Sequence, residues 1–352
     1  MIKKILVMAG GTGGHVIPAL TIAKALRAKG VMVEWLGSRE GLEAELVSNI
    51  HIPLHFIARI PIRNRDLKTL LLAPIRLINA LFQAIKIINT VKPDVVLGMG
   101  GYISFPGGVA TWLLRKPLAI HEQNAVAGLA NRWLAKLARV RFQAFPNVFS
   151  KAITVGNPIR ENILQLPNPA QRFSHRSGQL KLLVLGGSLG ALALNRILPT
   201  AVAAINQPLE IWHIAGKGKV EEVKIAYENL QIQAQIDAFV EDMASAYAWA
   251  DIVLCRAGAL TISELTAVGI GSILIPYPHS MDNHQLSHAC YLANSGAGFL
   301  IEEKELTAEA LVKILQSLQQ DRAKLLTMAN AAYRLGMRES TLRIVECLLK
   351  QE

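Results

Sequence analysis

The sequence predicts an α/β protein made of two Rossmann-like domains with parallel sheets, facing each other across a cleft. Two stretches, KKILVMAGGTGGH (3–15) and LKLLVLGGSLGAL (180–192), share one form: a basic residue, a short aliphatic strand, and glycines that open into a helical pattern. Each stretch begins a series of aliphatic strands that alternate with helical segments. Such a pattern is typical of a parallel sheet covered by helices on both faces.

Further strands are expected in both halves of the chain. Each is a short aliphatic run that ends in glycine or in a polar turn, at 31–37, 93–101, 116–124, 209–216, 250–258 and 271–278. The pattern fails at 156–179, which is rich in Pro, Asn, Gln and Arg, so the boundary between the domains is expected there. Ligands of such sheets bind beyond the carboxyl ends of the strands, which predicts a substrate in the cleft between the two sheets.

Composition narrows the class of protein. The 352 residues are 51% hydrophobic and 18% charged, which is typical of a globular protein. The net charge of +11 favours phosphates, nucleic acids or anionic membranes without choosing among them. Three widely separated cysteines argue against a disulfide framework and suit a reducing cytosol. No stretch of about 18 or more uncharged apolar residues occurs, so no membrane span is expected.

The glycine-rich turns distinguish between kinds of nucleotide site. A dinucleotide fingerprint would place a third glycine where Val16 stands and an acid at the end of the next strand, which instead closes with Gly37. No G-x-x-x-x-G-K-[ST] occurs, which excludes a P-loop. The alternative, that the glycines only make strand-to-helix turns, explains one turn better than it explains four: GGTGGH, GMGGYISFPGG, GGSLG and RAGALT.

Turns of this kind bring main-chain N–H groups at a helix N-terminus close to an anionic ligand, and the helix dipole favours a diphosphate. No D-x-D occurs and the histidines lack metal-ligand spacing, so no bound metal is expected. Arg160 and Ser188 are candidates for the remaining neutralisation of phosphate charge.

RAGALTISE (256–264) is the most specific of the four turns. It places Glu264 about one turn into a helix, where a carboxylate can accept both ribose hydroxyls. A capping box made of Thr261 and Glu264 is the structural alternative. A strand edge expected at Phe239 and Val240 would pair with a base.

Eight ordered motifs resemble one family, the MurG family of bacterial peptidoglycan N-acetylglucosaminyltransferases. The resemblance runs essentially from end to end of the chain. The motifs are GGTGGHVIPAL, GMGGYISFPGG, HEQNAVAGLANRWLAK, GNPIR, GGSLGA, FVEDMASAYAWAD, CRAGALTISE and DNHQLSHA.

The resemblance implies a GT-B fold with an N-terminal, acceptor- and membrane-side domain at 1–158 and a UDP-GlcNAc-binding domain at 159–336. A last helix at 337–352 is expected to pack back onto the first domain. The implied reaction moves GlcNAc from UDP-GlcNAc to the 4-hydroxyl of the MurNAc unit of lipid I, with inversion, to give lipid II and UDP. No metal or other cofactor is implied for the transfer.

The resemblance also implies the residues that contact the donor. Glu264 would hold the ribose, and Val240 would contact the uracil. Leu189 stands where the family usually carries glutamine. The loss of that side-chain amide puts in doubt only the fine positioning of the donor near its phosphates. The implied substrate-binding residues are Thr12, Gly13, Gly14, Asn124, Arg160, Ser188, Val240, Ala259, Leu260, Thr261, Ile262, Ser263, Glu264 and Gln285.

An inverting transfer needs a general base on the acceptor hydroxyl. His15, at the tip of the first glycine turn, is the expected catalytic residue because imidazole titrates near neutral pH. Two alternatives stay open: His15 only caps or hydrogen-bonds within its loop, or Glu122 is the base. Glu122, beside His121 and Asn124, would otherwise only orient loops.

The implied acceptor is a lipid, and the family is peripheral to the cytoplasmic face of the inner membrane. The segment 74–91 is predicted to form a helix that is mostly core, with a polar stripe from Arg76 to Thr90. Candidates for membrane contact are Leu71, Ile75, Ile78, Leu81 and Phe82, and candidates for contact with anionic headgroups are Lys68, Arg76, Lys136, Arg139 and Arg141. Cell-wall synthesis and division proteins are possible partners.

Three other functions remain as alternatives. A UDP-GlcNAc 2-epimerase would use the same fold and would turn over the donor without a lipid. A nicotinamide-dependent dehydrogenase is disfavoured by the missing third glycine. No nucleic acid is expected as a partner, because no recognised motif accompanies the positive charge.

Overall fold

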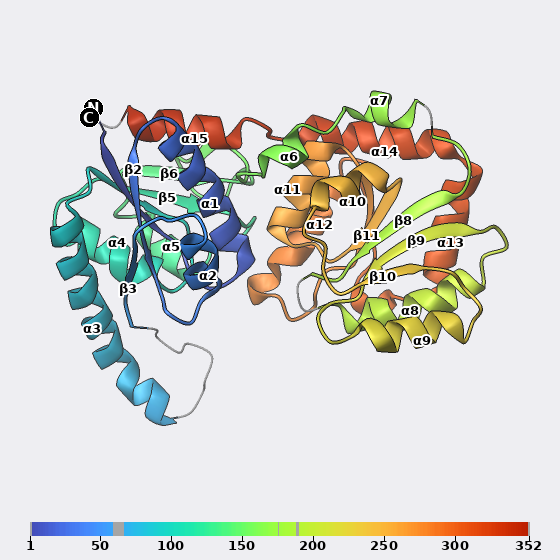
Figure 1. Cartoon of the computed structure of the whole chain (residues 1–352), viewed down its shortest axis with the longest axis horizontal. Helices are drawn as coiled ribbons and strands as arrows, with labels where there is room; N and C mark the ends of the chain where they lie inside the picture. Colours follow the sequence, from blue (N-terminus) through green and yellow to red (C-terminus); the bar gives the residue numbers. More distant parts are fainter. Residues whose placement is uncertain (1, 59–66, 175, 188–189, 351–352) are drawn as a thin grey trace. The chain divides into compact units, whose positions relative to one another are not determined.

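The computed structural model of the chain describes residues 2–58, 67–174, 176–187 and 190–350. Its contacts divide the polypeptide into two compact units (Figure 1). Unit 1 comprises Met1–Arg160 together with Arg338–Glu352, and unit 2 comprises Glu161–Met337. The boundary expected after residue 158 lies two residues before the observed division at Arg160. The boundary expected after residue 336 lies one residue before the observed division at Met337.

Unit 1 contains a parallel sheet. Within the described residues this sheet has seven strands, in the order β3-β2-β1-β4-β5-β6-β7, and every neighbouring pair is parallel. The predicted α/β class with a parallel sheet is therefore confirmed for this unit. The strands are β1 (Lys4–Met8), β2 (Met32–Gly37), β3 (Leu54–Phe56), β4 (Val95–Gly98), β5 (Leu118–Glu122), β6 (Val140–Gln143) and β7 (Ile153–Thr154).

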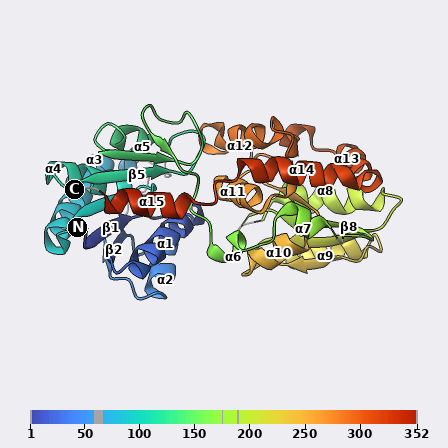
Figure 2. The same ribbon diagram turned by 90° about the horizontal axis from the view of Figure 1, so that it is seen from above.

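Helices cover both faces of this sheet (Figure 2). Successive side chains of a strand point to opposite faces, so Ile5 and Val7 enter one core while Leu6 and Met8 enter the other. Helices α1 and α15 complete the first core, and α3, α4 and α5 complete the second. The helices of unit 1 are α1 (Gly13–Ala28), α2 (Leu42–Ser48), α3 (Leu67–Val91), α4 (Ser104–Leu113), α5 (Leu129–Leu134) and α15 (Ser340–Leu349).

Helix α15, at the end of the chain, lies beside α1 at its start (Figures 1 and 2). Ile344, Val345 and Leu348 are buried in the core that α1 also enters. The Ser340 hydroxyl donates a hydrogen bond to the Gly156 carbonyl oxygen, at 2.9 Å. The C-terminal segment is thus an integral part of unit 1.

Unit 2 repeats the architecture of unit 1. Among the residues that the structure describes, six parallel strands form its sheet in the order β10-β9-β8-β11-β12-β13. The second predicted parallel-sheet domain is confirmed by this order. The strands are β8 (Leu180–Leu185), β9 (Leu209–Ile214), β10 (Gln235–Asp237), β11 (Ile252–Cys255), β12 (Gly271–Leu274) and β13 (Gly298–Leu300).

Side-chain caps begin several helices of unit 2. Asp242, Thr307 and Asp321 each accept a main-chain N–H within the first turn, which satisfies donors that have no partner inside the helix. The segment 156–179, expected to be irregular, contains the short helices α6 and α7. The helices are α6 (Glu161–Leu164), α7 (Pro169–Phe173), α8 (Leu192–Ala203), α9 (Val220–Glu228), α10 (Met243–Trp249), α11 (Ala259–Val268), α12 (His284–Ala293), α13 (Ala308–Gln320) and α14 (Arg322–Leu335), with 3₁₀ turns at Met281–Asn283 and Glu303–Glu305.

Three of the described histidines are buried in the two units. Burial lowers the pKa of His121, His213 and His288 to about 4, because the charged imidazolium loses its hydration. In unit 2 the ring of His213 lies between polar partners: Nε2 is 3.1 Å from Asn195 Oδ1, and Nδ1 is 3.1 Å from Tyr227 Oη. These histidines are therefore neutral in the folded protein at neutral pH.

We expect the free energy of unfolding to fall as the pH drops from about 6.5 to about 4. The unfolded chain protonates these three histidines at their ordinary pKa, so it binds more protons than the folded chain in this window. Each buried histidine contributes up to about 3 kcal/mol to this loss in the free energy of unfolding. Urea midpoints measured at pH 7 and pH 5 check this, and exposed His279→Gln should leave the difference unchanged. Equal midpoints at both pH values would contradict it.

Candidate functional site

Each sheet has a point where the direction of its connections reverses. In unit 1 this point lies between β1 and β4, and in unit 2 between β8 and β11. Ligands of open α/β sheets bind at such points, beyond the carboxyl ends of the strands. All four glycine-rich turns singled out in the sequence follow these four strands.

A buried carboxylate holds the first glycine turn of unit 1. Glu43, on α2, is 0% exposed, and its Oε2 accepts a hydrogen bond from Gly11 N at 3.0 Å. Its Oε1 accepts from the main-chain N and the hydroxyl of Ser38, at 2.9 and 2.8 Å. A Cβ on Gly10 would lie 2.8 Å from Glu43 Oε1, so glycine is needed for this approach. Glu43 fixes the path of the chain into α1.

The second glycine turn lies against the first. Gly101 has a φ of +79°, and a Cβ there would lie 2.2 Å from the Gly10 carbonyl oxygen. Gly100 has a φ of +90°, and its Cβ would lie 2.6 Å from Nδ1 of His15. Only glycine combines this backbone conformation with so close an approach. The two turns therefore form one surface, and the His15 ring is part of it.

His15 lies in the first turn of α1 and is partly exposed. Its Nδ1 is 3.1 Å from Oε1 of Gln123, which follows β5. The residues that the sequence placed at the tip of the first loop and in the HEQN motif are thus brought together. Thr12, Gly13 and Gly14 precede the ring at the start of the same helix.

Glu122 organises the loop that follows β5. Its side chain is 1% exposed, and Oε1 accepts from the main-chain and side-chain nitrogens of Asn124, both at 3.0 Å. Oε2 accepts from Gly128 N at 3.1 Å and from Asn131 Nδ2 at 2.9 Å. Both oxygens of this buried carboxylate are thus occupied by donors of its own loop and helix, and a general base must instead be within hydrogen-bond reach of the substrate. The geometry therefore favours loop orientation for Glu122 and places Asn124 beside it.

The GNPIR segment packs against the same loop. His121 Nε2 lies 2.9 Å from the Gly156 carbonyl oxygen, and Asn157 Nδ2 donates to the Gln123 carbonyl oxygen at 3.1 Å. Arg160, the last residue of this segment, is partly exposed. These contacts fix the chain that leads from unit 1.

In unit 2 the turn after β8 is equally constrained. Gly190 has a φ of +69°, and a Cβ there would lie 2.0 Å from the Ala215 carbonyl oxygen. Gly187 is also left-handed, with a φ of +81°. Ser188 and Leu189, between these two glycines, lie outside the described residues. The turn leads into α8.

The turn after β11 begins α11. The helix starts at Ala259 with Gly258 as its N-cap, so the alternative of a capping box made of Thr261 and Glu264 is wrong. Glu264 is 5% exposed, and its Oε2 accepts from Tyr247 Oη at 2.9 Å. The carboxylate is held in place by α10 rather than serving as a cap. Residues 259–264 form the first turns of α11.

Other contacts brace this turn. Arg256 pairs with Glu303, and its Nη1 donates to the Ile275 carbonyl oxygen at 3.2 Å. His288, on α12, lies 2.9 Å through Nδ1 from the Ala257 carbonyl oxygen. Gln285, one turn earlier on α12, accepts from Tyr277 N at 2.9 Å.

One expectation about unit 2 is corrected. The strand edge expected at Phe239 and Val240 is wrong, because β10 ends at Asp237 and both residues lie in the loop before α10. Phe239 is 65% exposed, whereas Val240 is half-buried. A short edge strand contains too few apolar residues for its last residue to be predicted from the sequence.

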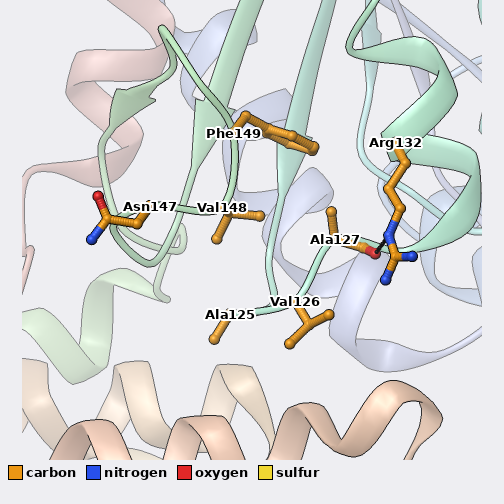
Figure 3. A pocket seen from close by; sticks show the side chains of 7 residues that line it. All are labelled: Ala125, Val126, Ala127, Arg132, Asn147, Val148 and Phe149. Atoms are coloured by element: carbon orange, nitrogen blue, oxygen red, sulfur yellow. Dashed lines mark hydrogen bonds between the residues drawn. The ribbon is translucent and has the colours of Figure 1, made fainter.

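Unit 1 also has a pocket beside the HEQN loop. Its volume is about 340 Å³, and it begins at Ala125, directly after Asn124. Figure 3 shows Phe149 between Arg132 on one side and Asn147 on the other. Arg132 Nε donates to the Ala127 carbonyl oxygen at 2.7 Å (Figure 3). The pocket is lined by Ala125, Val126, Ala127, Arg132, Asn147, Val148 and Phe149.

Helix α3 differs from the expected core helix. Its segment Leu72–Val91 is long and apolar enough to cross a membrane, although it carries two charged residues, and 17% of the residues in its apolar 18-residue window are buried. Ala80, Ala84 and Ile88 pack in the core of unit 1. The opposite side is apolar and exposed: Leu72 is 44%, Ile75 64%, Ile78 53% and Phe82 65% exposed. The expectation of a mostly buried helix is therefore wrong.

The exposed apolar side chains continue onto the neighbouring helices α4 and α5. Trp112 and Leu113 on α4, and Leu129 and Trp133 on α5, are each at least half exposed. Lys136 lies over the Trp133 ring at 4.8 Å. We call the exposed residues on these three helices the apolar face; they are Leu72, Ile75, Ile78, Phe82, Trp112, Leu113, Leu129 and Trp133. Leu81 packs toward the core, while the side chains of Lys68 and Leu71 lie outside the described part.

Among the described residues, no group of three or more His, Cys, Asp or Glu side chains is arranged to hold a metal ion.

Two sequence models match the chain: the glycosyltransferase family 28 N-terminal domain over residues 5–142, and the family 28 C-terminal domain over residues 181–344. The chain is 48% identical over 347 residues to the UDP-N-acetylglucosamine–N-acetylmuramyl-(pentapeptide) pyrophosphoryl-undecaprenol N-acetylglucosamine transferase of Aliivibrio salmonicida, covering 98% of this chain and 97% of that one. These matches span both units.

Solved structures agree with the sequence matches. The crystal structure of Acinetobacter baumannii MurG has a TM-score of 0.88 at 37% identity, covering 99% of this chain and 100% of that one. A UDP-GlcNAc 2-epimerase from Neisseria meningitidis, at 15% identity and a TM-score of 0.70 over 99% and 100% of the two chains, shares the fold alone. The chain therefore belongs to glycosyltransferase family 28, among the MurG N-acetylglucosaminyltransferases that its motifs resemble.

Proposed function

We propose that this chain is an inverting hexosyltransferase of peptidoglycan synthesis. It moves GlcNAc from UDP-GlcNAc to the 4-hydroxyl of the MurNAc unit of undecaprenyl-pyrophosphoryl-MurNAc-pentapeptide (lipid I), giving lipid II and UDP. The observation that carries this proposal is the match over 98% of the chain to a transferase named for this donor and acceptor. The glycine turns at both switch points support it, because they suit phosphorylated substrates.

Unit 2 is the proposed donor domain. The first turn of α11, from Ala259 to Thr261, presents main-chain N–H groups and the positive end of the helix to the diphosphate of UDP. The Glu264 carboxylate accepts hydrogen bonds from the ribose hydroxyls, and the hydrogen bond from Tyr247 holds it in place. We assign the remaining donor contacts to Val240 for the uracil and to Ile262, Ser263, Gln285, Arg160, Ser188, Thr12, Gly13, Gly14 and Asn124.

Unit 1 is the proposed acceptor domain, and His15 is its general base. As the oxygen of the acceptor hydroxyl attacks the anomeric carbon, His15 takes its proton, and the bond between that carbon and UDP breaks. The charge on the departing diphosphate is stabilised by the α11 N-terminus and Arg160. The pocket beside the HEQN loop begins at Ala125, next to Asn124 in the chain, and gives the acceptor a second surface in the same unit.

The apolar face is the proposed site of contact with the cytoplasmic leaflet of the inner membrane. Apolar side chains with tryptophans among them are typical of a surface that enters the headgroup region. Basic residues near it, Arg76, Lys136 and Arg139, add attraction to anionic lipids, and Arg141 follows them on β6. Peripheral attachment fits a lipid acceptor. Contacts with cell-wall synthesis and division proteins stay a prediction.

Phe82→Glu should lower binding to anionic vesicles at least about tenfold. The side chain is 65% exposed, so the folded unit does not depend on it, whereas its burial in lipid contributes about 2 kcal/mol. Co-sedimentation with phosphatidylglycerol vesicles measures this. Ile225→Glu, at a residue 47% exposed on α9 of unit 2, is the matched control and should bind as the wild type does. Equal loss in both variants would contradict the assignment.

One assay tests the proposed reaction. Labelled UDP-GlcNAc is incubated with a lipid I analogue in the presence of a chelator, and a lipid-linked disaccharide is sought. We expect label in the lipid fraction only when the acceptor is present. Turnover of the donor without acceptor, to the 2-epimer, would instead identify an epimerase. Formation of product only after magnesium is restored would contradict stabilisation of the leaving group without a metal.

A further inference from the structure

Gln123 has a side-chain amide whose orientation is fixed by its surroundings. The residue is 2% exposed, and its Nε2 donates a hydrogen bond to the Met99 carbonyl oxygen at 2.8 Å. A carbonyl oxygen only accepts, so the nitrogen of the amide must face Met99. The amide oxygen, Oε1, then faces His15. The chain at this point is also held by Asn157, which donates to the Gln123 carbonyl oxygen.

This orientation determines which nitrogen of His15 carries the proton. Oε1 of Gln123 lies 3.1 Å from Nδ1 of His15, and an amide oxygen has no proton to give. Nδ1 must therefore be the donor in the neutral ring, which leaves the lone pair on Nε2. Gly100, whose Cβ position lies 2.6 Å from Nδ1, keeps any side chain of the second turn away from this contact.

The neighbouring charged and titratable groups do not compete for Nδ1. His121 interacts electrostatically with His15 but is buried, and its pKa of about 4 keeps it neutral at neutral pH. The carboxylate of Glu122 is directed to Asn124, Gly128 and Asn131. Gln123 is thus the side chain that the structure pairs with the imidazole.

We propose that Gln123 is a positioning residue for the transfer reaction, which selects the Nδ1–H tautomer of His15 and leaves Nε2 to take the proton of the acceptor hydroxyl. When Nε2 accepts that proton, the ring becomes an imidazolium whose Nδ1–H still donates to Gln123 Oε1. The amide oxygen thereby stabilises the charge that develops in the transition state. The contribution to turnover rests on the proposed function, whereas the tautomer does not.

Two variants separate this role from a merely structural one. Gln123→Met has a similar length but neither an acceptor for Nδ1 nor a donor for Met99. Gln123→Glu keeps an oxygen acceptor for Nδ1 and loses the donor to Met99. If Gln123 only supports the fold, both variants should be impaired alike. If it sets the tautomer, the glutamate variant should recover what the methionine variant loses.

The tautomer is measured without substrate by NMR of protein labelled with ¹⁵N-histidine, with His15→Ala identifying the signals of His15. In the wild type and in Gln123→Glu we expect Nδ1 protonated and Nε2 unprotonated in the neutral ring. In Gln123→Met we expect a mixture of the two tautomers. Wild-type tautomer populations in Gln123→Met would overturn the proposal, whatever reaction the protein performs.

Kinetics supply the second readout. We expect kcat to fall about ten- to a hundredfold in Gln123→Met with the donor KM unchanged, and to recover in Gln123→Glu. Equal loss of kcat in both variants, with the wild-type tautomer retained, would reduce Gln123 to a support of the fold. A protein that transfers no GlcNAc at all would refute the proposed function while leaving the tautomer result to decide this proposal.

Discussion

His15→Ala should lower turnover at least about a hundredfold, with little change in affinity for the donor. General-base catalysis contributes about 10² to 10⁴ in rate, and its loss appears in kcat rather than in binding. The His15 ring is partly exposed at the meeting point of the first two glycine turns, so its removal leaves no large cavity.

Initial rates at varied UDP-GlcNAc, with saturating lipid I analogue, give kcat and the donor KM separately. His51→Ala, at an exposed histidine elsewhere in unit 1, serves as the control and should retain normal rates. Near-normal turnover in His15→Ala would remove His15 from the role of base.

Gly190→Ala is expected to be the most destabilising single substitution at the donor turn. The new Cβ would lie 2.0 Å from the Ala215 carbonyl oxygen, and the φ of +69° is strained for any residue with a side chain. The clash is with main-chain atoms, which cannot move aside as a side chain can. Together these effects should cost about 3 kcal/mol or more in the stability of unit 2.

Chemical unfolding followed through the fluorescence of Trp212 and Trp249 in unit 2 measures this loss. Gly218→Ala is the matched control, because Gly218 has a φ of +76° but open space at its Cβ position. It should cost only the left-handed strain, about 1 to 2 kcal/mol. If Gly190→Ala were no worse than Gly218→Ala, close packing of the turn would not be the reason for glycine.

The central strands of both sheets were predictable because they are buried on both faces. Every strand expected from a continuous aliphatic run is present, from β1 and β2 in unit 1 to β11 and β12 in unit 2. The strands that were missed are β3, β7, β10 and β13, which lie at sheet edges and have two or three residues each, and β6, next to the edge strand β7. Strand β6 has the sequence VRFQ, so it too lacks a continuous aliphatic run. An edge strand needs no apolar run, so it leaves little pattern in the sequence.

The contacts that shape the site were harder to predict. The sequence identified His15 and the HEQN motif, but nothing in it shows that Gln123 faces the imidazole. Glu43 is one of several acidic residues near the start of a helix, and only the fold reveals that it holds Gly11. Both contacts join residues distant in the chain, and local periodicity carries no information about such pairs.

Helix α3 illustrates the limit of periodicity in another way. An apolar sequence with a narrow polar stripe is typical of a buried helix, and this prediction failed because the polar residues partly face the protein. Gln83 accepts from Ala58 N at 2.8 Å, while Ile78 and Phe82 face outward. Periodicity places residues on a common face, but it does not show which face packs against the sheet.

A crystal structure with UDP-GlcNAc bound, grown in the presence of magnesium, would show how the donor diphosphate is held. We expect the diphosphate against the main-chain N–H groups at the start of α11, the ribose on Glu264, and no metal ion on the phosphates. A nucleotide bound elsewhere, or a diphosphate coordinated through magnesium to carboxylates of the chain, would contradict this expectation.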